Sequence, residues 1–346
     1  MISVAKPQSL GKILKAGLLA ASLLLLWGCG ERASYAKFEG ETMGTRYHIT
    51  AKLPPNVVAV DIHQQFKQRL EEINRSMSTW RDDSLISLFN QSEVGSVIPV
   101  DNDFLKVLDI SREVYKASNG AFNPGVGRLI DLWGFGRYLT VDQLQNPPSQ
   151  AAIDEAMARI RFDLIENRDR ELIKNSDIHL NFSAVAKGYA VDQLANVLVD
   201  AGVKDYMVEI GGEIATSGIS PRGTHWRIGI EMPEHVRGRA LKAIQVKKAA
   251  IATSGDYRNF IDINGKRYSH TIDPRTGSPM ENNLASVTVI AENVALADAW
   301  ATALTVVGAE EALKIAEQNK LAVFLITRKD NEFVSSYSTA MLAYLN

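Results

Sequence analysis

The sequence predicts an α+β fold in one large domain rather than a doubly wound parallel sheet. Strand-like segments outnumber regular alternations of strand and helix along the 346 residues, which argues against a parallel sheet. No internal repeat and no low-complexity linker divides the body of the chain. The apolar fraction of 46% and the charged fraction of 23% are ordinary for a globular protein with a sizeable core.

The N-terminus is expected to be a secretory signal that lies outside this fold. Lys6, Lys12 and Lys15 precede an apolar run that ends at Cys29. The run is too short for a stable membrane-spanning helix but suits a signal peptide. Its last residues, LLWGC, resemble a bacterial lipobox, with Trp27 standing where a smaller residue is usual. The segment predicts export of the chain; an uncleaved signal anchor is the alternative.

Cys29 is predicted to carry a lipid. It is the only cysteine of the sequence, so it forms no internal disulfide and its thiol is available for acylation. We expect residues 1–28 to be the signal peptide, residues 29–37 to be the lipidated cysteine and tether, and residues 38–346 to be the domain. Gly30 follows the cysteine, and the absence of aspartate there is typical of outer-membrane sorting. The domain would then lie in the periplasm, held to a membrane by its lipid.

The spacing of apolar residues predicts the elements of the first half. A run over 61–77 repeats apolar residues at three- and four-residue steps, which indicates an amphipathic helix. Asn119-Gly120 is a favoured helix C-cap and Ser149 a suitable N-cap. In chain order we expect a strand over 37–53 interrupted at Met43-Gly44, helices over 61–77 and 102–118, an irregular loop over 120–136 and a short helix after Ser149.

The second half is predicted to hold most of the strands. Asn264-Gly265 favours a tight type I′ turn between two strand-like runs, so residues 259–272 are a hairpin candidate. In chain order we expect a helix over 184–201, strands over 205–212 and 225–231, this hairpin, a strand over 284–290, a helix over 294–307, a short helix to 318 and a strand over 321–327.

The helix expected over 294–307 contains the sharpest candidate for chemistry. It is apolar nearly all round and is therefore expected to be buried, yet Asp298 and Thr302 lie in its middle, four residues apart on one face. A buried carboxylate is costly unless it is paired or binds a cation. A carboxylate and a hydroxyl are hard ligands that suit Mg²⁺ or Ca²⁺. Equally, the aspartate could be satisfied by backbone or a lysine, and the threonine could bond to the preceding turn.

The stretch NFSAVAKGYAVD, residues 181–192, is a candidate anion site. It lacks the spacing and the Lys-Ser/Thr ending of a P-loop, which excludes a nucleoside-triphosphatase loop. The start of a helix nevertheless attracts anions through its free amides and dipole, and Lys187 adds charge. The alternative is a solvated lysine beside an ordinary packing site of small residues.

His270 is the candidate proton acceptor. It lies at the end of the second strand of the expected hairpin, before the turn signals of the segment SHTIDPRTGSP. An ordinary pKa near 6.5 suits a histidine to take a proton from a substrate hydroxyl, and a structural histidine is the alternative. The net charge of −2 with no basic stripe argues against nucleic-acid binding.

Several short motifs together resemble one family. They are, in order, ETMGT, SMSTW, GAFNPGVG with LWGFG, AVAKGYAVD, EIGGEI, ATSGDYRNF, SHTIDPRTG and ADAWATAL. Their order and spacing, from about Phe38 to the C-terminus, are similar to those of the ApbE family of FAD:protein FMN transferases. The resemblance implies an ApbE-like, T-fold-related domain with mixed, mainly antiparallel sheets and flanking helices.

The resemblance also implies an activity. Family members bind FAD and Mg²⁺, cleave the pyrophosphate, and transfer FMN through its phosphate to a threonine or serine hydroxyl of a target protein, releasing AMP. Known targets are flavin-carrying subunits of the Na⁺-pumping NADH:quinone oxidoreductase and of Rnf-type complexes. Family members are periplasmic and often lipoproteins, which agrees with the interpretation of Cys29. Two alternatives use the same features: an Mg²⁺-dependent FAD pyrophosphatase and a non-enzymatic FAD-binding lipoprotein of the periplasm.

Roles follow from the resemblance position by position. The metal ligands would be the carbonyl of Ala184 with the side chains of Asp298 and Thr302, and His270 would be the general base beside the catalytic Asp298. The implied contacts to FAD are Met43, Trp80, Ala121, Phe122, Asn123, Asn181, Lys187 and Ile272. Trp80 and Phe122 offer stacking surface for an aromatic ring, and a place in the core is the alternative for both.

Three positions depart from the family pattern. Many members carry aspartate where this chain has Asn123 and Asn181, and proline where it has Arg128. Losing two carboxylates removes negative charge around an anionic ligand, which would ease FAD binding or weaken a second cation contact. The pair of Asp298 and Thr302 is untouched.

Overall fold

The computed structural model describes residues 35–137, 143, 146–233, 240–255, 260–263, 266–330 and 332–345. The expected signal peptide and Cys29 lie outside these residues. Strand β1 begins at Tyr35, so the last three residues of the expected tether belong to the folded body. Within the part of the chain described, no helix is both long and apolar enough to cross a bilayer.

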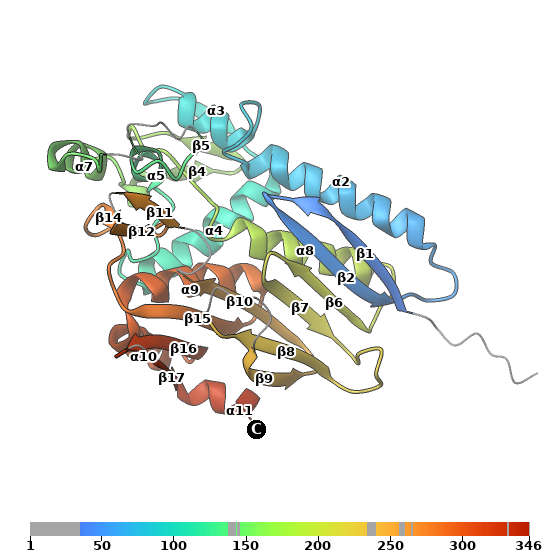
Figure 1. The fold of residues 1–346 in the computed structure, drawn as a ribbon. Helices are drawn as coiled ribbons and strands as arrows, with labels where there is room; N and C mark the ends of the chain where they lie inside the picture. The colour runs from blue at the N-terminus through green and yellow to red at the C-terminus, as the bar shows by residue number, and fades with distance from the viewer. Residues whose placement is uncertain are drawn as a thin grey trace, which may run out of the picture.

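An eight-stranded antiparallel sheet forms the centre of the molecule (Figure 1). Each neighbouring pair of its strands runs antiparallel, which confirms the α+β class. In spatial order the strands are β1 (Tyr35–Thr42), β2 (Thr45–Lys52), β6 (Tyr206–Ile210), β7 (Glu213–Ser217), β10 (Ala249–Gly255), β15 (Leu284–Ala291), β16 (Ala322–Lys329) and β17 (Glu332–Tyr337).

The first expected strand is in fact a hairpin. Met43 and Gly44 have φ angles of 49° and 71°, and Thr42 pairs directly with Thr45. Two residues in the left-handed region form the tight turn whose twist matches antiparallel strands. The Met-Gly pair that interrupts the apolar pattern therefore reverses the chain.

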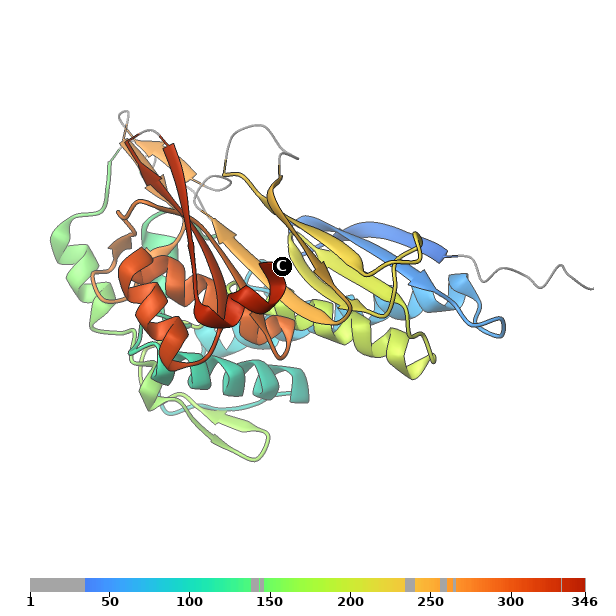
Figure 2. The same cartoon turned by 90° about the horizontal axis from the view of Figure 1, so that it is seen from below.

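Helices cover one face of the sheet (Figure 2). They are α2 (Ala59–Met77), α4 (Asn102–Ala117), α8 (Ala186–Asp200), α9 (Val294–Val307) and α10 (Ala309–Gln318), and all five were expected. The buried apolar face of α2 repeats at helical spacing, through Ile62, Phe66, Leu70, Ile73 and Met77. At the end of α4, Asn119 and Gly120 have positive φ, as their role in the C-cap requires.

A partly buried ion pair holds three of these helices together. Arg69 of α2 donates from Nη1 and Nη2 to the two carboxylate oxygens of Asp103 on α4, each at 2.6 Å. The hydroxyl of Tyr189 on α8 donates to the same carboxylate at 2.7 Å. A bidentate arginine–carboxylate pair fixes orientation as well as distance. The contact positions the first turns of α8, where the candidate anion site lies.

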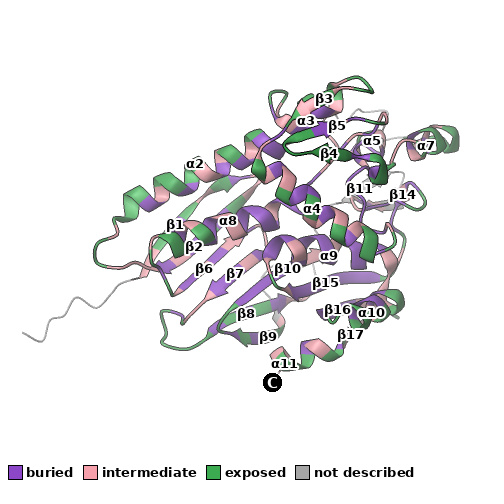
Figure 3. Cartoon of the chain, turned by 180° about the vertical axis from the view of Figure 1, so that it is seen from behind, coloured by how far each residue is buried: buried purple, intermediate pink, exposed green. Residues whose placement is uncertain are grey.

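The other face of the sheet is covered by β8 (Trp226–Glu231), β9 (Ala240–Val246) and the C-terminal α11 (Leu342–Leu345). Their apolar side chains pack against the sheet in a second core cluster, separate from the cluster under the helices. The strand β8 was expected, whereas β9 and its neighbour β10 were not. Figure 3 shows that β15, between the two layers, is buried along nearly its whole length.

Smaller elements surround one end of the helix layer. They are α3 (Leu85–Gln91), β3 (Val97–Pro99), α5 (Gly127–Leu132), α7 (Gln150–Met157), η1 (Phe162–Leu164), β4 (Glu166–Arg168), β5 (Glu171–Ile173), β11 (Phe260–Ile263), β12 (Lys266–Ser269), β13 (Ile272–Asp273), β14 (Ser278–Pro279) and, elsewhere in the chain, η2 (Thr339–Met341). The Ser149 side chain caps α7, and β11 pairs with β12, as expected. The turn residues 264–265 lie outside the described residues.

Candidate functional site

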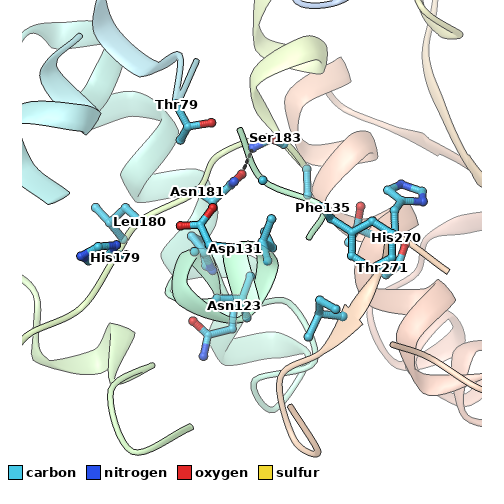
Figure 4. A pocket seen from close by; sticks show the side chains of 18 of the residues that line it. Thr79, Asn123, Asp131, Phe135, His179, Leu180, Asn181, Ser183, His270 and Thr271 are labelled. Carbon is cyan, nitrogen blue, oxygen red and sulfur yellow. Dashed lines mark hydrogen bonds between the residues drawn. The ribbon is translucent and has the colours of Figure 1, made fainter. Parts of the chain in front are cut away.

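A pocket of about 780 Å³ lies between the helix layer and the smaller elements. Its size is in the range of cofactor and ligand sites. Most of the residues assigned from the resemblance line it: Trp80, Ala121, Phe122, Asn123, Asn181, Ala184, Lys187, His270, Ile272, Asp298 and Thr302. Figure 4 shows how Asn123, Asn181 and His270 lie around this space.

Met43 is not among the residues that line the pocket. It lies at the tip of the β1–β2 hairpin, where its side chain is partly buried against the main core. Its part in binding FAD therefore stays a prediction. Cys29 lies outside the described residues, so its lipidation also stays a prediction.

Three of the residues that line the pocket offer oxygen atoms: Asp298, Thr302 and Ala184. Asp298 and Thr302 lie one turn apart on α9, and Ala184 belongs to the segment that leads into α8. Asp298 is only 3% exposed and accepts a hydrogen bond from the backbone N–H of Gly188 at 3.1 Å. The hydroxyls of Thr302 and Ser254 lie 3.4 Å apart. The backbone partner anticipated for a structural aspartate is thus present, and the threonine faces β10 rather than the preceding turn.

These three groups fit a hard divalent cation. A carboxylate, a hydroxyl and a carbonyl are the oxygen donors that Mg²⁺ takes from proteins, with its remaining positions filled by water or substrate phosphate. Within the described residues there is no cluster of three or more His, Cys, Asp or Glu side chains that could hold a metal. Of the three groups named here, only Asp298 would contribute a negative charge to a cation at this corner.

The helices α8 and α9 approach closely at this corner because of Gly188. A Cβ atom at this position would lie 2.4 Å from the carbonyl oxygen of Val294 and 2.8 Å from the Cα of Ala295. The carboxylate of Asp192, one turn further along α8, accepts hydrogen bonds from the backbone N–H groups of Val294 and Ala295, each at 2.9 Å. The start of α9 is thereby fixed against α8, next to the pocket.

Lys187 lies between two buried carboxylates. Its Nζ is 2.9 Å from Oε1 of Glu213 and 3.7 Å from Oδ2 of Asp298. Burial alone lowers the pKa of this lysine, but the charges of Asp298 and Glu213 outweigh burial and raise the pKa above its ordinary value. Lys187 is therefore a permanent cation in the wall of the pocket.

Glu213 is a pocket residue that the sequence analysis did not single out. Burial raises its pKa to about 7, although the charge of Lys187 opposes the rise. It follows a turn in which Gly211 and Gly212 have positive φ and in which Oε1 of Glu209 accepts from the N–H of Gly212 at 2.7 Å. The motif EIGGEI is thus a hairpin that presents Glu213 to the helices. A carboxylate at the start of an otherwise uncharged strand, directly after the Gly-Gly turn, was the available signal.

Asn123 and Asn181 make different contacts. The amide nitrogen of Asn123 donates to the carbonyl of Ile160 at 3.1 Å, and its oxygen accepts from the N–H of Gly125 at 2.8 Å. The side-chain oxygen of Asn181 accepts from the N–H of Ser183 at 2.9 Å (Figure 4). An aspartate would serve the second position but would lack the donor that the first position uses.

His270 and Ile272 form another part of the pocket wall. His270 belongs to the segment that links β12 to β13, where Figure 4 shows it beside Thr271, and Ile272 is the first residue of β13. The indole N–H of Trp133 donates to the carbonyl of Gly277 at 2.8 Å, which ties the β13–β14 turn to α5. A residue at the end of α5, 144 positions away in the sequence, thus helps to hold this wall in place.

The two aromatic candidates occupy different environments. Phe122 is 4% exposed and belongs to the main core, as its alternative role requires, while also lining the pocket. Trp80 is 61% exposed at the edge of the pocket, in the loop between α2 and α3. In the same loop, Asp82 forms an ion pair with Arg137 from the segment after α5. Trp80 is therefore accessible to an aromatic ligand.

His179 also lines the pocket and was not anticipated. Burial, with a further contribution from the charge of Arg128, lowers its pKa to about 4. The next residue, Leu180, exchanges two hydrogen bonds with the side chain of Asn90, at 2.8 and 2.7 Å, which fixes this wall of the pocket to α3. His179 is consequently a neutral imidazole at physiological pH.

Comparison with known proteins bears on the family of this chain. The ApbE family model matches residues 43–325. A protein of Haemophilus influenzae named FAD:protein FMN transferase is 38% identical over 95% of this chain and 97% of its own length. The solved structure of flavin transferase ApbE from Vibrio cholerae superimposes with a TM-score of 0.83 at 35% identity, covering 90% of this chain and 100% of the other.

A second solved structure, the apo form of the flavinyl transferase ApbE from Pseudomonas stutzeri, gives a TM-score of 0.81 at 34% identity, covering 90% of this chain and 97% of the other. The family resemblance inferred from the motifs and the expectation of an enzyme are both confirmed by these relatives, which are named transferases. On the family match and the full-length identity, the chain belongs to the ApbE family.

Proposed function

We propose that this protein is an Mg²⁺-dependent FAD:protein FMN transferase. It would move FMN from FAD to a threonine or serine hydroxyl of a target protein, forming a phosphoester bond and releasing AMP. The observation that carries the proposal is the convergence of Asp298, Thr302 and Ala184 with Lys187 and His270 in one pocket. Relatives named FAD:protein FMN transferase, which align with this chain over nearly their full length, support it.

The chemistry is a phosphoryl transfer with balanced bonds. The target hydroxyl oxygen forms a bond to the phosphorus of the FMN half, the bond from that phosphorus to the bridging oxygen breaks, and AMP leaves with the electron pair. His270 would accept the hydroxyl proton. Mg²⁺ bound at Asp298, Thr302 and the Ala184 carbonyl would neutralise charge that develops on the phosphates.

The remaining residues of the pocket bind and orient. Lys187 would contribute a fixed positive charge to the diphosphate, and it helps catalysis only if it favours the transition state over bound FAD. The exposed ring of Trp80 offers a stacking surface for one of the two ring systems of FAD. Ala121 to Asn123, Asn181 and Ile272 would contact the nucleotide, and Met43 would do so from the β1–β2 turn.

The proposal extends to place and partner. The lipobox-like segment supports lipidation of Cys29 and a periplasmic domain anchored to a membrane. In that compartment the acceptors would be flavin-carrying subunits of the Na⁺-pumping NADH:quinone oxidoreductase or of Rnf-type complexes. The flavin is cargo in this reaction, and no hydride moves.

Incubation of the purified protein with FAD, Mg²⁺ and a candidate acceptor subunit tests the proposal. Intact-mass spectrometry should show the acceptor gaining one FMN, with AMP released in equal amount. No adduct with any candidate subunit of the host would overturn the transferase. Free FMN and AMP formed at the same rate without acceptor would indicate a pyrophosphatase, and FAD that stays bound and intact for hours would indicate a binding protein.

A further inference from the structure

Glu213 has a buried oxygen that the fold leaves uncommitted. The residue is 3% exposed and lines the pocket. Its Oε1 accepts a hydrogen bond from Lys187 at 2.9 Å, whereas Oε2 has no hydrogen-bond partner among the described residues. Buried polar atoms without partners are uncommon in native proteins, and each one calls for a functional or structural reason.

The charged groups around Glu213 indicate that its role is electrostatic. Both carboxylates that face Lys187 have side chains only 4% exposed, so neither is screened well by water. One ammonium therefore lies between two buried carboxyl groups. It lies 2.9 Å from Glu213 and 3.7 Å from Asp298, so the closer pairing is with the strand and not with α9.

This difference matters for the metal corner. An ammonium paired closely with Asp298 would weaken the binding of a divalent cation to the same carboxylate. Two positive charges a few ångströms apart repel each other strongly where bulk water is excluded. The carboxylate of Asp298 also accepts the N–H of Gly188, which limits how far it can turn away. A second anion that attracts Lys187 removes this competition.

We propose that Glu213 is a positioning residue that draws Lys187 toward β7 and so keeps Asp298 available to a divalent cation. The inference rests on the proposed function and concerns the same site. Because Oε2 is uncommitted, Glu213 can accept a further hydrogen bond from the ammonium when a cation occupies the Asp298 corner. Glu213 thus acts on the cation through Lys187 and is not itself a ligand.

Cation binding without turnover provides the test. Mg²⁺ binding is measured by calorimetry, and Mn²⁺ binding by electron paramagnetic resonance, on the purified protein and its variants. We expect Glu213→Gln to weaken cation binding by about tenfold or more, in the range seen when a partner of a metal-site residue is lost. Glu213→Asp, which keeps the charge, should stay near the wild-type affinity. Glu39→Gln removes an exposed carboxylate from the same sheet and is the matched control.

The double variant Glu213→Gln with Lys187→Met separates the possible roles. If Glu213 acts by holding Lys187, removing the ammonium as well should restore cation affinity toward the wild-type value. Affinity that stays low in the double variant would overturn the inference, because Glu213 would then be a direct ligand. Unchanged affinity in Glu213→Gln would overturn it too. Wild-type protein that binds neither cation would overturn the metal in the proposed function and this inference together.

Discussion

Gly188 of α8 and Val294 of α9 meet backbone to backbone, and a Cβ at Gly188 would lie 2.4 Å from the Val294 carbonyl oxygen. Real Cβ atoms do not approach backbone oxygen so closely, so any side chain at this position must push the two helices apart. The close approach brings the Lys187 side of α8 to Asp298, whose carboxylate accepts the Gly188 N–H. The geometry around Asp298, the proposed cation ligand, therefore depends on the absence of one methyl group at Gly188.

The first prediction concerns this contact. Gly188→Ala should gain about 1 kcal/mol of helix propensity but lose about 1–3 kcal/mol to overpacking, so a net loss of stability is expected. Chemical denaturation measures the loss, and calorimetry should show weaker Mg²⁺ binding. Asn196→Ala, on the exposed side of α8, is the control: it also gains helix propensity but adds no overpacking, so it should lower neither quantity. A fully stable Gly188→Ala variant with normal Mg²⁺ affinity would show that the helices can separate freely.

Removal of the proposed carboxylate ligand should abolish both cation binding and transfer. In Asp298→Ala the corner keeps only a hydroxyl and a carbonyl, which do not hold Mg²⁺ against water. We expect transfer to fall by about a hundredfold or more, the loss typical of a group that stabilises transition-state charge. Glu292→Gln, an exposed carboxylate just before α9, is the control. Full activity in Asp298→Ala would show that the metal assignment is wrong.

Loss of the proposed base should separate rate from binding. His270→Ala is expected to lower the transfer rate by about a hundredfold or more, the usual contribution of a general base, while FAD binding is retained. Single-turnover kinetics with saturating FAD and acceptor measure the rate, and flavin fluorescence measures binding. An unchanged rate would make His270 a structural residue of the β12–β13 segment.

The two asparagines should respond differently to aspartate. Asn123→Asp would place a carboxylate against the Ile160 carbonyl, to which the amide now donates at 3.1 Å, and should cost about 1–3 kcal/mol at pH 7. Asn181→Asp keeps the oxygen that accepts from Ser183 and should cost little. Urea denaturation compares the pair.

The pH dependence of this difference has a defined sign. The carboxyl introduced at Asn123→Asp can donate to the Ile160 carbonyl only when it is protonated, so its folded pKa should be raised above the ordinary value. The penalty is then largest above the folded pKa and shrinks as pH falls through it. Equal losses for both variants, or a penalty that grows toward pH 5, would contradict this assignment of the Asn123 amide.

His179 should contribute to the loss of stability in acid. Its folded pKa of about 4 lies below the ordinary value near 6.5, so the unfolded chain binds the proton first as pH falls. The contribution is fully present above pH 6.5 and is lost progressively toward pH 4, at up to about 3 kcal/mol. His179→Gln should flatten this part of the stability profile, whereas the exposed His225→Gln should not. Identical acid profiles for wild type and His179→Gln would contradict the prediction.

Local patterns predicted much of this fold because they depend on neighbouring residues. The faces of α2 and α9 and the cap of α7 follow from spacing and from Ser149, within single elements. The strands β10 and β17 were not predicted. β10 consists largely of small residues without alternation, and β17 is a largely exposed edge strand. Neither pattern distinguishes a strand from a loop.

The site was only partly accessible to the same reasoning. Asp298 and Thr302 stand out because both lie on one helix, but the partners of Asp298, Gly188 and Lys187, lie about 110 residues away on α8. No spacing rule joins elements so far apart in the chain. The resemblance located Ala184 and His270 through motifs, whereas Glu213 and His179 emerged only from their burial and charge in the folded chain.

The two faces of the eight-stranded sheet place different constraints on the sequence. Lys187, Glu213 and Asp298 lie on the helix side, whereas β8, β9 and α11 pack on the other side, and none of their described residues lines the pocket. Substitutions in that outer layer are therefore expected to affect folding stability alone, whereas substitutions beneath the helices are expected to affect the chemistry of the pocket as well. Over evolutionary time the two faces of one sheet can diverge at different speeds, and a lineage can remodel the outer layer without altering what the enzyme transfers.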